Sequence, residues 1–363
     1  MPMFGDFEKV LGHRRLTGLV TKDSPVDELA GSEIFTNRKT VDTISFDYDI
    51  VREPTTPANI TAIGAKATRI PRFKVGQAHG AITEINEFDV LEKKDILYLR
   101  QPGTEHEPMM LAQIQKAQER LMKRIRRRTE LMRWDILAGS YSQARINEKI
   151  HPLTYTTTFP INQYNSPNVN LWGLSPGTDD GATPGAPILS QYIVQIEREF
   201  KRLSFGNTIK RAYANGITTD KLIGVREVSK WWKDYGARDK QILDSHFFNN
   251  LGTWQWTRYE GADTTTEAND STRTLTYHIP DNIVYLMPEG NVAGATWVEG
   301  PNIAPLDAIG STPGEVISTV PSGIVSYAKW HDDPQGVAIY VSYAFGAYIE
   351  FPEAIMKMTL RNT

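Results

Sequence analysis

The sequence predicts an α+β fold, in which helices and strands form separate runs instead of the alternating βαβ order. Three patterns predict it: one long helix over residues 108–139, a strand of strict alternation over 44–50, and closing strands over 337–360. A second helix, short strands and turns lie between the long helix and the closing strands. The expected order is therefore arm, hairpin, long helix, mixed region and closing strands.

The long helix is predicted from Pro108 to Gly139. Proline favours the first turn of a helix and glycine its end, and neither residue occurs in between. At a rise of 1.5 Å per residue the helix would be roughly 48 Å long, more than a compact domain needs. Its apolar stripe recurs at steps of three and four residues, and we expect the stripe to pack on the closing strands. The stripe consists of Met110, Ile114, Ala117, Leu121, Ile125, Met132 and Ile136.

A β-hairpin is predicted before this helix. Apolar and polar residues alternate along its first strand, as in a strand buried on one face. A loop rich in threonine and proline at 53–59 is the expected tip, a basic return strand is expected at about 65–75, and residues 76–107 are expected to be irregular. A lone hairpin is marginally stable, so its apolar face must rest on its own chain or on a neighbour's. That face consists of Ile44, Phe46, Tyr48 and Ile50.

The second half of the chain predicts shorter elements. Residues 189–203 have a helical stripe that ends before Gly206, residues 218–224 resemble a short strand, and 226–234 a short helix. Short strands and turns are expected over 246–288. No internal repeat is present.

Composition excludes several classes of protein. The chain has 363 residues, a length typical of about two domains, and 40% of them are hydrophobic, so wholesale disorder is excluded. The net charge of -3 excludes a strongly basic nucleic-acid binder as the description of the whole chain. There is no cysteine, hence no disulfide and no thiolate metal site. The first fifteen residues lack an apolar core of the length that a signal peptide has, and no apolar run reaches the length of a membrane-spanning helix, so neither is expected.

Motifs for catalysis are missing from the sequence. There is no phosphate-binding glycine loop and no nucleophile elbow, and the seven histidines lack metal-ligand spacing. We therefore expect no catalytic residue, no cofactor and no metal site, and a protein that is not an enzyme. His331-Asp332-Asp333 is the nearest pattern to a cation site, but residues 332–336 are interpreted as an ordinary turn between strands. Trp254 and Trp256, which alternate with Gln255, are interpreted as core residues.

The strongest charge feature is a basic face on the long helix. It consists of Lys123, Arg124, Arg126, Arg127 and Arg128. Such a face neutralises phosphates without reading sequence, or pairs with acidic residues of another copy. It is also typical of a solvated helix surface with local support from Glu119 and Glu130. The residues alone favour the last interpretation.

The order and spacing of several short stretches resemble a known family, the lambda-like major capsid protein E group of tailed bacteriophages. The hairpin resembles the family's extended loop, and the long helix its spine helix with an aromatic and small residues at the end. The stretches that carry the resemblance are Val41–Phe73, Glu130–Gly139, Thr219–Gly224, Trp256–Gly261, His278–Pro288, Lys329–Pro334 and Phe351–Ala354. The similarity covers nearly the whole chain.

The resemblance implies the Hong Kong 97-type capsid fold and a major capsid protein that self-assembles into the icosahedral shell around double-stranded DNA. It implies an N-terminal arm, an extended loop, a peripheral domain with the spine helix, an axial domain and a return to the peripheral strands. The corresponding ranges are 1–37, 38–88, 89–175, 176–315 and 316–363. Expected partners are further copies in hexamers and pentamers, a scaffolding protein, a portal, a decoration protein and packaged DNA, with no membrane. The expected location is the virion, assembled in the host cytoplasm.

Together the residues and the resemblance predict that the hairpin of one copy lies across the long helix of a neighbour. The residues expected at that contact are Ile44, Phe46, Tyr48, Ile50, Glu53, Lys66, Arg69 and Arg72. Two alternatives stay open: an encapsulin-type shell protein of the same fold, and a β-rich carbohydrate-binding or hydrolytic protein that uses the tryptophans.

Overall fold

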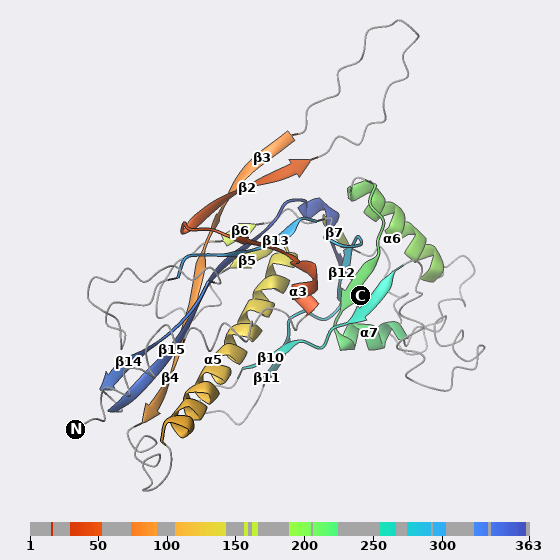
Figure 1. Cartoon of the computed structure of the whole chain (residues 1–363). Coiled ribbons are helices and arrows are strands. Elements are labelled where there is room, and N and C mark those ends of the chain that lie inside the picture. Colours follow the sequence, from red (N-terminus) through yellow and green to blue (C-terminus); the bar gives the residue numbers. More distant parts are fainter. Residues whose placement is uncertain are drawn as a thin grey trace, which may run out of the picture. The chain divides into compact units, whose positions relative to one another are not determined.

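A computed structural model gives the structure of the chain (Figure 1). It describes residues 16, 30–52, 74–92, 106–142, 156–158, 162–165, 189–204, 206–223, 254–265, 274–291, 293–302, 323–332 and 335–360. The chain divides into two compact units, each built from three segments. The first unit comprises Met1–Tyr48, His79–Met132 and Thr296–Tyr348, and the second comprises Asp49–Ala78, Arg133–Ala295 and Ile349–Thr363.

A five-stranded sheet forms the body of the first unit. Its path is β1-β13-β15-β14, and β4 pairs with β15 as the fifth strand. The long central strand β15 pairs antiparallel with β14 and with β4, and β1 pairs parallel with β13. The strands are β1 (Asn37–Thr40), β4 (Thr83–Glu92), β13 (Ala295–Glu299), β14 (Ile324–Asp332) and β15 (Gln335–Ile349).

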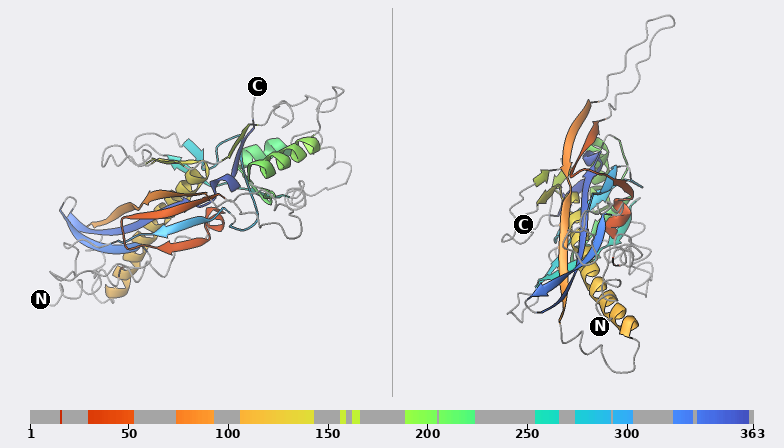
Figure 2. Two further views of the ribbon diagram at one scale, coloured as in Figure 1. Left: turned by 90° about the horizontal axis from the view of Figure 1, so that it is seen from above. Right: turned by 60° about the vertical axis from the view of Figure 1, so that its left-hand side comes forward.

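The long helix α5 (His106–Leu137) lies alongside this sheet, as the views of Figures 1 and 2 show. Ile114 and Ala117 pack in one buried cluster with Ala328 of β14 and with Val337 and Ile339 of β15. Every member of the predicted stripe from Ile114 to Ile136 is buried. The predicted helix, its apolar face and its packing on the closing strands are thus confirmed.

Residues 76–107 are not irregular as expected, because they contain two strands. Strand β3 (Lys74–Ala81) pairs with β2 (Ser45–Arg52), and β4 follows it after one residue. The return strand was expected at about 65–75, of which residues 65–73 lie outside the described part of the chain; the described strand β3 begins at Lys74. The alternation in β4 was obscured because Glu87 and Asp89 occupy its helix-facing positions, where apolar residues are the usual signal.

A short helix and a buried carboxylate connect the N-terminal part of the first unit to α5. The helix α3 (Ala30–Ile34) begins beside Glu130, whose carboxylate accepts a hydrogen bond of 2.8 Å from the backbone N–H of Gly31. Glu130 is fully buried. The sequence predicted an exposed Glu130 that supports the arginines; the structure buries it, with the backbone of Gly31 as one of its partners.

A second five-stranded sheet forms the body of the second unit, in the order β7-β16-β12-β8-β9. Helix α6 (Leu189–Leu203) covers one face, where Ile196 and Phe200 pack with Trp254, Trp256 and the alternate residues of β16. Helix α6 has the predicted bounds, and both tryptophans are core residues as predicted. The strands are β7 (Asn162–Asn165), β8 (Arg211–Ala214), β9 (Gln255–Arg258), β12 (Ile283–Met287) and β16 (Met356–Thr359).

The other face of this sheet packs on the end of α5. Trp134 is buried and its ring lies 4.9 Å from that of Tyr259 and 5.7 Å from those of Tyr213 and Tyr285, measured between centroids. Burial, and secondly the negative charge of Asp135, raises the pKa of Tyr285. This aromatic cluster explains the tryptophan near the end of the predicted helix.

The remaining elements of the second unit are short. Two small antiparallel sheets consist of β5 (Ser140–Ser142) with β6 (Thr156–Thr158), and of β10 (Ala262–Thr265) with β11 (Thr274–Tyr277). A 3₁₀ turn, η5 (Pro352–Ala354), precedes β16. The short helix expected at 226–234 lies outside the described residues.

The short strand expected at 218–224 is wrong, since Gly216–Ile223 forms helix α7. The β-branched residues of this stretch favour a strand by propensity. However, Asn215 precedes the helix, and its side-chain oxygen accepts a hydrogen bond of 2.7 Å from the N–H of Thr218. This N-cap satisfies a donor that the first turn leaves without a helical partner. Local capping therefore outweighs strand propensity here.

Candidate functional site

The root of the β2–β3 hairpin is held against β15 by aromatic rings. The ring of Tyr48 stacks on Tyr348 at 4.7 Å, and the ring of Phe46 lies 5.7 Å from Tyr348. A Cβ atom at Gly80 or Gly346 would come within 2.3 or 2.7 Å of the Phe46 ring, so both positions require glycine for this packing. Burial raises the pKa of Tyr48. Phe46 and Tyr48 are therefore covered by their own chain, and the hairpin root is anchored there.

The other residues expected at a contact between copies have different positions. Ile44 is 77% exposed, Ile50 is half-buried, and Asp47 and Asp49 are exposed. Asp47 also pairs with His79 across the hairpin. The expected contact residues Glu53, Lys66, Arg69 and Arg72 lie outside the described part of the chain. At the root, Ile44 is thus the apolar side chain that is open to another copy.

The basic face of α5 divides into residues with and without partners in the same chain. Arg124 forms an ion pair of 2.7 Å with Glu87, and Arg120, one turn earlier, forms one of 2.9 Å with Asp89. Positions four apart on a helix and two apart on a strand have similar spacing, roughly 6 Å and 7 Å, so both pairs form together. These acids of β4 were missed in the sequence, although their i, i+2 spacing opposite arginines at i, i+4 is a readable signal.

The remaining members of the basic face have graded exposure. Lys123 and Arg127 are exposed, and no described residue pairs with either of them. Arg126 and Arg128 are half-buried, and Arg126 has an interaction within the chain. Lys123 and Arg127 are therefore the positive charges of this face that are available to an external anion.

A row of aromatic side chains crosses the face of the first sheet opposite to α5. The rings of Tyr327 and Tyr340 stack at 4.9 Å, those of Tyr340 and Phe88 at 5.1 Å, and the Lys329 amine lies within 6 Å of both tyrosine rings. Such cross-strand pairs stabilise a sheet. Phe88 of β4 is 50% exposed; Trp330 of β14, which pairs with Val337 and so lies on the other face of the sheet, is 58% exposed. Exposed aromatic residues of this kind are enriched at interfaces, and the sequence analysis did not single them out.

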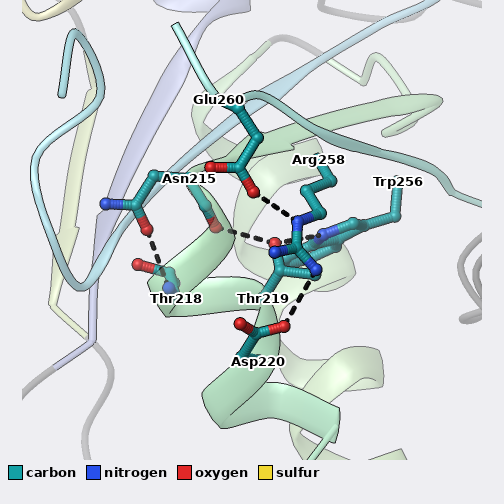
Figure 3. A network of polar contacts seen from close by, with 7 residues as sticks. All are labelled: Asn215, Thr218, Thr219, Asp220, Trp256, Arg258 and Glu260. Carbon is teal, nitrogen blue, oxygen red and sulfur yellow. Dashed lines mark hydrogen bonds and ion pairs between the residues drawn. The ribbon is translucent and has the colours of Figure 1, made fainter. Parts of the chain in front are cut away.

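Figure 3 shows a polar network that fixes the start of α7 in the second unit. The Asn215 amide donates to the backbone oxygen of Ile279 and to Asp281, and its backbone oxygen accepts from the Thr219 hydroxyl. The indole N–H of Trp256 donates to the same hydroxyl at 3.3 Å. Asn215 thus joins α7, β8 and the turn before β12.

The outer part of this network consists of charges. Arg258 donates to Asp220 at 2.9 Å and to Glu260 at 2.5 Å. The Glu260 carboxylate lies so close to the first turn of α7 that a Cβ at Gly216 would come within 2.0 Å of its oxygen. A carboxylate at a helix N-terminus is favourable. All these acids and bases pair with one another, so the network is structural.

Neither a metal-binding cluster nor a membrane-spanning helix occurs in the described ranges. No group of three or more histidine, aspartate or glutamate side chains there is arranged to hold a metal ion. The search of the same ranges found no helix that is long and apolar enough to cross a membrane. His331 and Asp332 end strand β14, and Asp332 pairs with Gln335 at the start of β15, so the chain reverses between them; residues 333 and 334 lie outside the described part of the chain.

Solved structures share this arrangement. A prophage protein of Escherichia coli CFT073 described as a capsid protein matches with a TM-score of 0.54 and 12% identity, covering 96% of this chain and 99% of that one. A phage-related protein of Bordetella bronchiseptica RB50 matches with a TM-score of 0.53 and 9% identity, covering 95% and 96%. At these identities the likeness shows the fold. No curated protein matches the sequence.

The hairpin, the long helix on its sheet and the second unit thus define the class by its fold, which is the Hong Kong 97-type fold. The chain belongs to the phage major capsid protein E family, whose model matches residues 12–360. It is accordingly a major capsid protein that forms the shell of a phage particle, as the resemblance predicted. The family is structural and not enzymatic.

The Asn215 cap yields a first prediction. Asn215→Ala should lower the free energy of unfolding by about 1–3 kcal/mol, because it removes the cap and leaves the buried N–H of Thr218 without its acceptor. Urea denaturation followed by circular dichroism measures the change. Ile217→Ala on the same turn is the matched control, since Ile217 is exposed and not part of the cap; a change of less than about 0.5 kcal/mol is expected. Equal effects of the two substitutions would contradict this role of Asn215.

The pairs between α5 and β4 yield a second prediction. Arg124→Glu should destabilise the protein by about 1 kcal/mol, because it replaces the attraction to Glu87 by repulsion between two carboxylates. Adding Glu87→Arg should restore most of the loss, and a double-mutant cycle in thermal unfolding measures the coupling. The control is Arg127→Glu, which has no described partner and should leave the melting temperature nearly unchanged. If the cycle shows no coupling between positions 124 and 87, the ion pair does not contribute to the stability of the protein in solution.

Proposed function

We propose that copies of this chain assemble as hexamers and pentamers into an icosahedral shell that encloses the double-stranded DNA genome of a tailed phage. Membership of the major capsid protein E family supports the formation of a shell. The anchored root of the hairpin supports the hairpin as the element that joins one copy to the next. Shell formation would take place in the host cytoplasm and end in the virion. A portal, a scaffolding protein and a decoration protein are the further partners that the family resemblance implies.

The domain roles belong to the same proposal. The ranges proposed are 1–37 for the arm, 38–88 for the extended loop, 89–175 and 316–363 for the peripheral domain, and 176–315 for the axial domain. The helix–sheet layer of the first unit corresponds to the peripheral domain, and the sheet with α6 and α7 to the axial domain. The two compact units divide the chain differently from these ranges: residues 133–175 and 349–363 belong to the second unit, and 296–315 to the first.

The hairpin is proposed as the element that joins one copy to the next. Its root is fixed by Phe46 and Tyr48, so these rings determine where the hairpin leaves its own chain. The exposed Ile44 and the aspartates beside it remain for contact with a neighbour. The charged residues Glu53, Lys66, Arg69 and Arg72 extend the proposed contact. Many weak contacts of this kind add up over a closed shell.

The hairpin proposal predicts the phenotype of a deletion. Removing Pro54–Thr68 should abolish regular shells, because it removes the part of the hairpin beyond the anchored root. The subunit should remain folded, since Phe46 and Tyr48 stay on β15. Negative-stain electron microscopy counts the shells, and thermal unfolding tests the subunit. A variant with residues 54–68 in scrambled order is the matched control for length, and it should also fail to form regular shells. Normal shells from the deletion variant would refute the contact.

The basic face of α5 is proposed to meet packaged DNA without sequence preference. Arg120 and Arg124 are already neutralised by Asp89 and Glu87. The exposed Lys123 and Arg127 therefore supply the charge for phosphate contact. An acidic segment of a neighbouring copy is the competing partner for the same two side chains. If the partner is DNA, removal of these charges lowers the DNA content of the shells; if it is a neighbouring copy, removal prevents shell formation.

Neutralising these two charges separates the partners. Lys123→Gln with Arg127→Gln should leave shell number unchanged and lower the DNA content per shell, or its retention at high salt, because counterion release is weakened. The DNA-to-protein ratio of purified particles measures this effect. Arg198→Gln with Lys201→Gln on α6 is the control, since it removes two exposed charges from the other unit. Loss of shells in the α5 variant would instead show that the residues contact a neighbouring subunit.

A further inference from the structure

Asn215 and Gly216 form the one Asn-Gly pair of the sequence. In an unrestrained chain this pair is the asparagine context most prone to deamidation. Glycine has no side chain that shields its backbone nitrogen, and it leaves the backbone free to bend towards the asparagine amide. In the native subunit both residues are buried at the start of α7. The pair that reacts most readily in an unfolded chain thus forms the cap of a helix.

Deamidation at such a pair is an intramolecular substitution. The backbone nitrogen of Gly216 loses its proton to water or hydroxide and attacks the side-chain carbon Cγ of Asn215. A C–N bond forms, the side-chain amide nitrogen leaves as ammonia, and a succinimide ring results. Water then opens the ring at one of its two carbonyl groups. The product is either an aspartate or an isoaspartate, which has one additional carbon in the main chain.

Three hydrogen bonds hold the side chain of Asn215 in a geometry that does not allow this attack (Figure 3). Its amide nitrogen donates to the backbone oxygen of Ile279 at 3.2 Å and to Asp281 at 2.6 Å. Its oxygen accepts from the backbone N–H of Thr218 at 2.7 Å. Ring formation turns the backbone and the side chain out of the capping geometry, so all three bonds must break first. Breaking them in a buried site is costly.

Glu260 opposes the first step of the reaction as well. Its carboxylate pairs with Arg258 and lies against Gly216, where a Cβ atom would come within 2.0 Å of a carboxylate oxygen. A negative charge disfavours the formation of a second negative charge beside it, so the carboxylate hinders loss of the proton from the Gly216 nitrogen. The same close approach requires glycine at position 216. The packing therefore requires both members of the reactive pair.

We propose that Asn215 is a deamidation site that the native fold closes and that opening of the α7 cap exposes. In an unfolded chain the reaction proceeds as in a free Asn-Gly peptide. In the native subunit it proceeds only during the fraction of time in which the cap is open. The modification is irreversible, so it converts a transient opening of the second unit into a permanent loss of stability.

Each product is incompatible with the native cap. An aspartate at position 215 has no donor for the backbone oxygen of Ile279, and its carboxylate faces that of Asp281, to which the amide donates in the native protein. Two carboxylates at this distance repel each other. An isoaspartate lengthens the main chain directly before α7. The N–H and the hydroxyl of Thr219, which both donate to the backbone oxygen of residue 215, then lose their register.

The rate of deamidation in the full-length subunit tests the gating. The subunit is aged at mildly alkaline pH in buffer and, in parallel, unfolded in urea, and mass spectrometry of the peptide that contains Asn215 and Gly216 follows the reaction. The native subunit should react at least about 100-fold more slowly, because opening of a buried cap is rare. Equal rates in the two conditions would overturn the proposal. Folding of the subunit suffices for this experiment, so its result does not depend on shell assembly.

Variants at Asp281 separate opening of the cap from unfolding of the whole unit. Asp281→Ala removes one acceptor of the Asn215 amide and should accelerate deamidation of the native subunit by about 10-fold. Asp281→Asn keeps an oxygen that can accept the same bond and should accelerate it less. Met356→Ala is the control, since it creates a cavity in the core of the second unit and its side chain makes none of the bonds of the cap. The proposal is overturned if Met356→Ala accelerates the reaction more than Asp281→Ala does.

Asn215→Asp tests the consequence of the modification without ageing. It should lower the melting temperature at neutral pH, and the loss should shrink as the pH falls to about 4, where protonation of one carboxyl removes the repulsion and restores a donor. Adding Asp281→Asn, which exchanges the two groups, should recover part of the stability at neutral pH. A melting temperature of Asn215→Asp equal to that of the native protein at neutral pH would contradict the proposed loss of stability.

Discussion

The packing of the apolar stripe of α5 against the strands β14, β15 and β4 is the interaction on which the rest of the first unit depends. Ile114 and Ala117 lie directly on Val337 and Ile339, and the small alanine allows the helix to approach the sheet closely. Burial of this stripe is the main favourable term, since a helix of this length with many charges has little stability from propensity alone. The hairpin root and the ion pairs are both positioned by this layer.

Some of the basic side chains of α5 pair with acids of the same subunit, and others are open to its surroundings. Glu87 and Asp89 on β4 bind two of the arginines, and these surface pairs set the register of helix and sheet more than they add stability. The side chains left over, Lys123 and Arg127, face outward. A protein whose net charge is -3 thus presents a local basic stripe, which suits non-specific contact with a polyanion.

In the second unit, polar side chains hold a short helix and several turns in fixed positions. Asn215 does so with one side chain that caps α7 and reaches the turn before β12. At that turn Asn282 has a positive φ of 62°, a conformation that asparagine tolerates better than most residues. Its backbone N–H donates to the Thr218 hydroxyl at 2.9 Å, so the turn and the helix stabilise each other.

The sequence by itself determined the elements whose burial follows one period: α5, α6, the strand at Phe46 and Tyr48, and the closing strands. Periodicity predicts these because a buried face must be apolar at a fixed spacing. The sequence also sufficed to predict the family, because the short stretches that carry the resemblance occur in a fixed order over nearly the whole chain; the family model matches residues 12–360.

Only the tertiary structure decided what each face touches. Strand β4 was missed because its inward acids are satisfied by arginines more than 30 residues away, and α7 because one asparagine cap outweighs β-branched propensity. Phe46 and Tyr48 showed an apolar face, but their alternation is the same whether that face meets the same chain or another. The partner of a side chain depends on distances in space, which the spacing along the chain does not contain.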